Sequence, residues 1–213
     1  MLERPGWGGS VVTGKATESS DLDIVVLTRF DPVHRRSLLY LGWPVELFIH
    51  TETSLKEYLA ADVARRQPSL PRMVGESVIL LDSDGSAMKW QSKARMMITS
   101  GPPRMTGEEI DAARYAITDL IDDLKGRASE AETAGIAVQL WQHTLTLSAT
   151  GAGRWTGTGK GLIRAVDPDL AQRSVVALRT ALDGSCAALI KLADQVLADH
   201  GGRLWAGYRA GEV

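Results

Sequence analysis

Hydrophobic and polar positions follow two different patterns along the chain, and the change comes near residue 100. In the first part, apolar runs rich in β-branched residues predict strands over residues 23–28, 45–50 and 77–81. The second run follows Gly42-Trp43-Pro44, which we interpret as a chain breaker. Between the second and third runs, Ser54 and Glu57 have capping-box spacing. This spacing predicts a helix with one apolar face, made of Leu55, Tyr58, Leu59 and Val63.

After the turn-forming segment Ser100-Gly101-Pro102-Pro103, the pattern is helical. Thr106 and Glu109 form a second capping box, and apolar residues then recur at helical spacing: Ile110, Ala113, Ile117, Leu120, Ile121 and Leu124. Further helices are predicted over about 134–149, from Asp167-Pro168 onward, and up to His200-Gly201-Gly202. We therefore expect an α+β fold with two domains. Residues 1–100 form a small mixed sheet with helices, and residues 104–213 form a helical bundle.

Composition limits the classes of partner. With 44% hydrophobic and 23% charged residues, the 213-residue chain has the composition of a globular protein. Its net charge of −2 gives no overall attraction to nucleic acid or to an anionic membrane, so neither is expected as a partner. No apolar stretch approaches the roughly 18 residues that span a bilayer. The single cysteine, Cys186, forms no internal disulfide, which is compatible with the cytoplasm, where we expect the protein.

Two carboxylates, Asp21 and Asp23, stand at the start of the first apolar run. Residues two apart on a strand point to the same side, so both carboxylates should face one spot while Leu22, Ile24 and Val26 enter the core. Two like charges at this distance repel unless a cation lies between them. The pair therefore predicts a metal site. The alternative is a turn at Ser19-Ser20-Asp21 that only leads into the strand.

The pair Gly9-Ser10 precedes the aspartates by about ten residues, and the combination resembles the motif of the DNA polymerase β-like nucleotidyltransferase superfamily. Within it, a compact mixed domain followed by a helical bundle is similar to antibiotic nucleotidyltransferases of the kanamycin type and their uncharacterised bacterial relatives. The resemblance is concentrated in residues 9–50. It implies a Mg²⁺-dependent transferase that moves a nucleoside monophosphate, AMP from ATP, to a hydroxyl of a small molecule or protein and releases pyrophosphate.

The expected chemistry assigns roles to individual residues. Magnesium takes oxygen ligands, and Asp21 and Asp23 can bridge two ions roughly 3.5–4 Å apart. Gly9 and Ser10 are predicted to bind the nucleotide, because glycine lets the backbone approach a phosphate and free N–H groups can cradle it. In the superfamily a third carboxylate comes from a neighbouring strand. Glu46, the acidic residue inside the second predicted strand, is its counterpart, as a metal ligand or as the general base. The alternative is a glutamate that faces solvent.

Lys160 lies in the glycine-rich stretch 151–161. The stretch fails as a Walker-type phosphate loop, because Arg154 replaces the first glycine and Gly161 follows the lysine where Ser or Thr would hold magnesium. Family members supply a lysine to the triphosphate from the helical domain. Lys160 resembles that lysine by its position, which implies a nucleotide-binding role; the alternative is a solvated surface lysine.

A second function from a different class shares these features. A nucleotidyltransferase-like antitoxin or regulatory protein would have the same fold and act on a helical protein partner. The resemblance is also compatible with a homodimer. In either case the helical bundle is expected to bind the acceptor substrate, and the predicted carboxylates are Asp21, Asp23 and Glu46.

Overall fold

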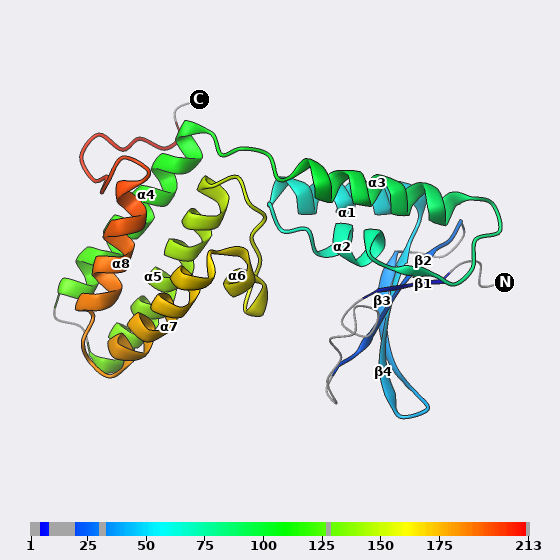
Figure 1. Ribbon diagram of the computed structural model, residues 1–213, viewed down its shortest axis with the longest axis horizontal. Helices are drawn as coiled ribbons and strands as arrows, with labels where there is room; N and C mark the ends of the chain where they lie inside the picture. The colour runs from blue at the N-terminus through cyan, green and yellow to red at the C-terminus, as the bar shows by residue number, and fades with distance from the viewer. Residues whose placement is uncertain (1–4, 9–19, 30–32, 127–128, 212–213) are drawn as a thin grey trace. The chain divides into compact units, whose positions relative to one another are not determined.

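A computed structural model describes residues 5–8, 20–29, 33–126 and 129–211 (Figure 1). The chain divides into two compact units, residues 1–102 and residues 103–213, called here the N-terminal unit and the C-terminal unit. The N-terminal unit combines a β-sheet with helices, and the C-terminal unit is helical. The fold is therefore α+β, as the sequence predicts.

The sheet of the N-terminal unit has five strands in the order β3-β4-β2-β1-β5. Its central pair, β2 (Leu22–Leu27) and β4 (Trp43–His50), is parallel. The flanking pairs are antiparallel, with β3 (His34–Tyr40) on β4, β1 (Pro5–Gly8) on β2, and β5 (Val78–Ile79) on β1. The sheet is thus mixed. The pattern of apolar residues predicts β2, β4 and β5, but it predicts neither β1 nor β3.

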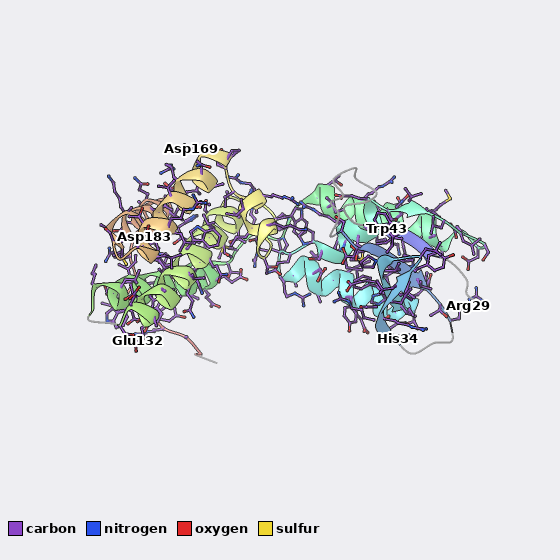
Figure 2. The ribbon with its side chains drawn as sticks, turned by 90° about the horizontal axis from the view of Figure 1, so that it is seen from below. Arg29, His34, Trp43, Glu132, Asp169 and Asp183 are labelled. Atoms are coloured by element: carbon purple, nitrogen blue, oxygen red, sulfur yellow. The ribbon has the colours of Figure 1, made fainter. Side chains whose placement is uncertain are left out.

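Strands β3 and β4 form a hairpin, which corrects the expectation of a breaker at Gly42-Trp43-Pro44. Tyr40 pairs with Trp43, so only Leu41 and Gly42 form the loop. Both have positive φ, 50° and 85°, as in the type I′ turn that suits two-residue hairpins. Pro44 is tolerated inside β4 because the pairing with β2 begins only at the next residue, Val45. Trp43 marks this end of β4 in Figure 2.

Three helices accompany the sheet: α1 (Glu52–Ala64), α2 (Ser69–Gly75) and α3 (Ser86–Ser100). Helix α1 begins earlier than predicted, because its N-cap is Thr51 and the box partner at N3 is Ser54. On the predicted apolar face, Leu55 and Leu59 are buried, but Tyr58 is 53% exposed. The core between sheet and helices consists of Leu27, Leu55, Leu59, Leu70, Val74, Trp90 and Ala94.

The side of β2 that meets the helices is the opposite of the expected one. Val25 and Leu27 pack into the helix-covered core, whereas Leu22 and Ile24 are only half-buried and Val26 is buried outside that cluster. Side chains alternate along a strand, so the odd-numbered positions of β2 share the helix-covered face. By the same alternation, Asp21 and Asp23 stand on that same face.

The C-terminal unit consists of α4 (Gly107–Lys125), α5 (Glu130–Gly151), α6 (Lys160–Ala165), α7 (Pro168–Leu182) and α8 (Ala187–Ala198). The predicted capping box of Thr106 and Glu109 is confirmed, as is the start of α7 at Asp167-Pro168. Helix α5 extends beyond the predicted 134–149 at both ends. Asp169 and Asp183 mark the two ends of α7 in Figure 2.

One apolar cluster holds the C-terminal unit together. Its largest fully buried members come from three helices: Ile117, Ile121, Leu140, Leu145, Leu147, Leu189 and Leu197. Helices α4, α5, α7 and α8 pack around this cluster, as expected for a helical bundle. Within the residues that the structure describes, no helix is both long enough and apolar enough to cross a membrane.

Candidate metal centre

Two neighbouring strands bring three carboxylates together. Asp21 immediately precedes β2, Asp23 is the second residue of that strand, and Glu46 lies in β4. The parallel register pairs Asp23 directly with Glu46, so both side chains leave the sheet on the same face. A shift of this register by one residue would turn the carboxylate of the shifted strand to the other face of the sheet.

The ligand oxygens of Asp21, Asp23 and Glu46, called here the acidic triad, all lie within 4.8 Å of one another, and the three residues are half-buried. Magnesium–oxygen bonds of about 2.0–2.1 Å place opposite ligands about 4.2 Å apart, so the spacing suits a divalent cation after a small adjustment. Carboxylate oxygen is also the ligand type that Mg²⁺ prefers. The structure thus brings together the three residues that the sequence singles out.

Strand β3 adds two polar side chains that the sequence analysis missed. Ser37 pairs with Glu46 in the hairpin register, and its Oγ donates to Glu46 Oε1 at 3.4 Å. Arg35 forms an ion pair with the same carboxylate, in which its Nη2 donates to Glu46 Oε2. The one signal that could have found these partners is the turn at Leu41-Gly42, because the turn sets the hairpin register. With that register, Arg35 and Ser37 fall on the triad's face of the sheet.

The end of β1 lies beside the triad. The antiparallel register pairs Gly8, the last residue of β1, with Asp23. Gly9 and Ser10 follow Gly8 directly in the chain, but they lie outside the described residues. Their predicted contact with a phosphate therefore stays a prediction. What the register does establish is that the strand leading into the Gly-Ser pair ends at the carboxylates.

Lys160 is the exposed first residue of α6, after Gly159 with φ 50°. It belongs to the C-terminal unit, whereas the acidic triad belongs to the N-terminal unit. Its role toward a triphosphate stays a prediction for this reason.

Beyond Asp23, the helix-covered face of the sheet contains a small cavity of about 40 Å³. Its lining is largely apolar and includes Val25, Leu27, Leu55, Val74 and Trp90. A cavity of this size holds a few waters at most, so it offers no room for a nucleobase. The face therefore changes from polar at the triad to apolar at Val25, two residues further along β2.

The sequence matches no protein-family model, and no curated protein is significantly similar to it. Among solved structures, the chain is similar to a nucleotidyltransferase-like protein from Exiguobacterium sibiricum at 13% identity and a TM-score of 0.43. The similarity covers 92% of this chain and 74% of that one. A likeness at this level identifies neither family nor activity.

Proposed function

We propose that the protein is a magnesium-dependent nucleotidyltransferase that moves a nucleoside monophosphate, AMP from ATP, to a hydroxyl of a small molecule or protein. The observation that carries this proposal is the acidic triad, whose ligand oxygens lie within 4.8 Å of one another. The register of β1 supports it, because Gly8, the residue that precedes Gly9-Ser10 in the chain, pairs with Asp23.

In the proposed reaction, the acceptor oxygen forms a bond to the α-phosphorus while the bond to the pyrophosphate oxygen breaks, and the hydroxyl proton passes to a base. Asp21, Asp23 and Glu46 would hold Mg²⁺, which stabilises the charge on the attacking and leaving oxygens when bound. Glu46 accepts hydrogen bonds from Arg35 and Ser37, so either role, as a metal ligand or as the general base, has to accommodate these two donors. Gly9, Ser10 and Lys160 are assigned to the phosphates, following the resemblance.

The first test combines metal binding with nucleotide transfer. Purified protein is incubated with Mg²⁺, α-labelled ATP and a panel of hydroxyl acceptors, and Mn²⁺ binding is followed by electron paramagnetic resonance. The variants Asp21→Asn and Asp23→Asn should lose about 10²–10³-fold in transfer rate, because a catalytic metal contributes several kcal/mol to transition-state stabilisation. They should also lose tight Mn²⁺ binding.

The matched control is Glu57→Gln, which neutralises an exposed carboxylate on α1 in the same unit. It should leave transfer and Mn²⁺ binding within about twofold of the wild type, because surface charges at a distance are screened. The proposal is wrong if the wild-type protein binds no Mn²⁺–ATP and labels no acceptor. It is also wrong if the Asp23→Asn variant transfers the label as fast as the control.

A further inference from the structure

Arg35, on the edge strand β3, contacts the acidic triad through Glu46. Its Nη2 donates to Glu46 Oε2, and its guanidinium lies over the Phe48 ring, 5.0 Å from the ring centroid. The register explains both contacts, because Arg35 pairs with Phe48 while its second neighbour, Ser37, pairs with Glu46. All these side chains therefore share the face that holds the triad.

These contacts fix the guanidinium from two sides, although the Arg35 side chain is 60% exposed. An exposed ion pair alone is usually worth little, since water competes for both partners and neither side chain is held. Here the Phe48 ring packs against one face of the Arg35 guanidinium, and the Glu46 side chain is only 20% exposed. The arrangement is thus more defined than a surface ion pair.

Both oxygens of Glu46 already have a donor: Oε1 accepts from Ser37 and Oε2 from Arg35. A divalent cation that takes Glu46 as a ligand must therefore displace one donor or share the carboxylate with it. The charge of Arg35 also opposes the approach of any cation to the triad. Together these effects lower the affinity of the triad for a cation that arrives alone.

The electrostatic effect of Arg35 is different for a metal ion that arrives bound to a triphosphate. The phosphates carry negative charge, and a guanidinium is a strong partner for phosphate oxygens because of its planar set of donors. The repulsion between Arg35 and the metal is then offset by the attraction between Arg35 and the phosphates. Arg35 thus lowers the affinity of the triad for the bare ion more than its affinity for the metal–nucleotide complex.

We propose that Arg35 is a positioning residue that holds Glu46 and makes binding of the divalent cation depend on the triphosphate. This inference rests on the proposed function, since it assumes that the triad binds a metal ion with a nucleotide. The β3–β4 hairpin, which carries Arg35, would then set the order of binding. The metal ion binds to the triad together with the nucleotide and not before it.

The test measures Mn²⁺ affinity with and without a non-hydrolysable ATP analogue. Without nucleotide, Arg35→Gln should bind Mn²⁺ about tenfold more tightly than the wild type. This is the size expected for removing a unit charge about 5 Å from a divalent cation in a water-like dielectric. The gain in Mn²⁺ affinity caused by the ATP analogue should shrink by a similar factor.

Arg36→Gln is the matched control, because it removes the same charge from the next residue of the same strand. Arg36 is exposed and pairs with Leu47, so its side chain stands on the opposite face of the sheet from Arg35. It should change Mn²⁺ affinity by no more than about twofold. Arg35→Lys keeps the charge and should stay within about threefold of the wild type without nucleotide.

Two kinds of failure can be distinguished. If Arg35→Gln binds Mn²⁺ like Arg36→Gln or more weakly, while Asp23→Asn abolishes binding, the inference about Arg35 is overturned and the metal site stands. If wild-type protein binds no Mn²⁺ with or without the analogue, the proposed function fails first. Circular dichroism checks that each variant is folded. If Arg35→Gln does not fold, Phe48→Leu is used instead, because it removes the ring that packs against the guanidinium. This variant should also bind Mn²⁺ more tightly than the wild type, by a smaller factor than expected for Arg35→Gln. Equal or weaker binding overturns the inference.

Discussion

The acidic triad of the N-terminal unit contrasts with a set of helix-capping carboxylates in the C-terminal unit. Three carboxylates of the C-terminal unit accept hydrogen bonds from backbone N–H groups close by in sequence. Glu109 accepts from Thr106 N at 2.8 Å, Glu132 from Ser129 N at 2.8 Å, and Asp167 from Asp169 N at 2.9 Å. Each bond satisfies a donor at the start of a helix, where negative charge also interacts favourably with the helix dipole.

In the N-terminal unit, the acidic triad gathers three carboxylates from two strands within 4.8 Å. This proximity stabilises nothing by itself, because like charges repel; the ion pair with Arg35 offsets the charge of Glu46. The difference shows that an acidic residue next to a helix start is explained by the helix. An acidic residue that converges with others across a sheet is not explained by a helix start, and the three together could hold a metal ion.

Of the stability effects that distinguish the acidic triad from the helix-capping carboxylates, we expect the effect of metal removal to be the largest. A ligand that binds only the folded state stabilises it by about 2.7 kcal/mol when its concentration is about a hundred times its dissociation constant. Under that condition, Mg²⁺ or Mn²⁺ with ATP should raise the free energy of unfolding of the wild-type protein by about this amount. Chelation with EDTA should remove the gain, as measured by urea denaturation.

Asp21→Asn should show no such gain, and its free energy of unfolding without metal should equal or exceed that of the wild type, because one repulsive charge is gone. Glu57→Gln should keep the full metal effect. A metal-induced gain that survives in Asp21→Asn would place the cation somewhere other than the triad, and the contrast between the units would no longer hold.

The sequence predicts carboxylates that cap a helix better than it predicts carboxylates that come together from different strands. The box of Thr106 and Glu109 and the cap at Asp167-Pro168 are confirmed, because both depend on residues no more than three apart. The same local reasoning is wrong at α1. There Ser54 belongs to two overlapping patterns, and the observed box begins at Thr51.

Convergence across the sheet depends on strand pairing, which short-range patterns describe only in part. Asp21, Asp23 and Glu46 could be singled out because the nucleotidyltransferase-like motif and two apolar strands point to them. Arg35 could not, because its contact with Glu46 depends on the hairpin register. That register follows from a turn with Leu41 at positive φ, a position where sequence rules favour Asn, Asp or Gly.

Cap removal tests the other side of the comparison and should have an intermediate effect. Thr106→Ala and Asp167→Ala each remove an acceptor for a backbone N–H at a helix start, which costs about 1 kcal/mol of stability. Neither variant should change Mn²⁺ affinity. Urea denaturation and a Mn²⁺ titration on the same samples provide both readouts.

Asp183→Ala is the control for Asp167→Ala, because it removes a carboxylate at the opposite end of the same helix (Figure 2). Negative charge is unfavourable near a helix C-terminus, so this variant should leave stability unchanged or slightly higher. A loss of 1 kcal/mol for Asp183→Ala as well would mean that the carboxylates of α7 act through something other than the cap.

The smallest expected effect is on the pH dependence of stability, for which we compare one histidine from each unit. Burial lowers the pKa of His50, whose residue is 5% exposed, and its Nδ1 lies 3.2 Å from Ser54 Oγ. Burial also lowers the pKa of His143, but that residue is exposed and solvent screens its charge. We therefore expect His50 to contribute more to the pH dependence of stability than His143.

The sign follows from the lowered pKa. Above the unfolded pKa of about 6.5, His50 is neutral in both states and its contribution to stability is complete. As the pH falls below that value, the unfolded chain takes up a proton that the folded protein resists, so the free energy of unfolding decreases. Between pH 7 and pH 6 this loss stays below about 1 kcal/mol for one group. Urea denaturation should show a smaller pH slope for His50→Gln than for His143→Gln. Equal slopes in the two variants would mean that the buried histidine of the sheet unit is no more sensitive to protonation than the exposed one of the helical unit.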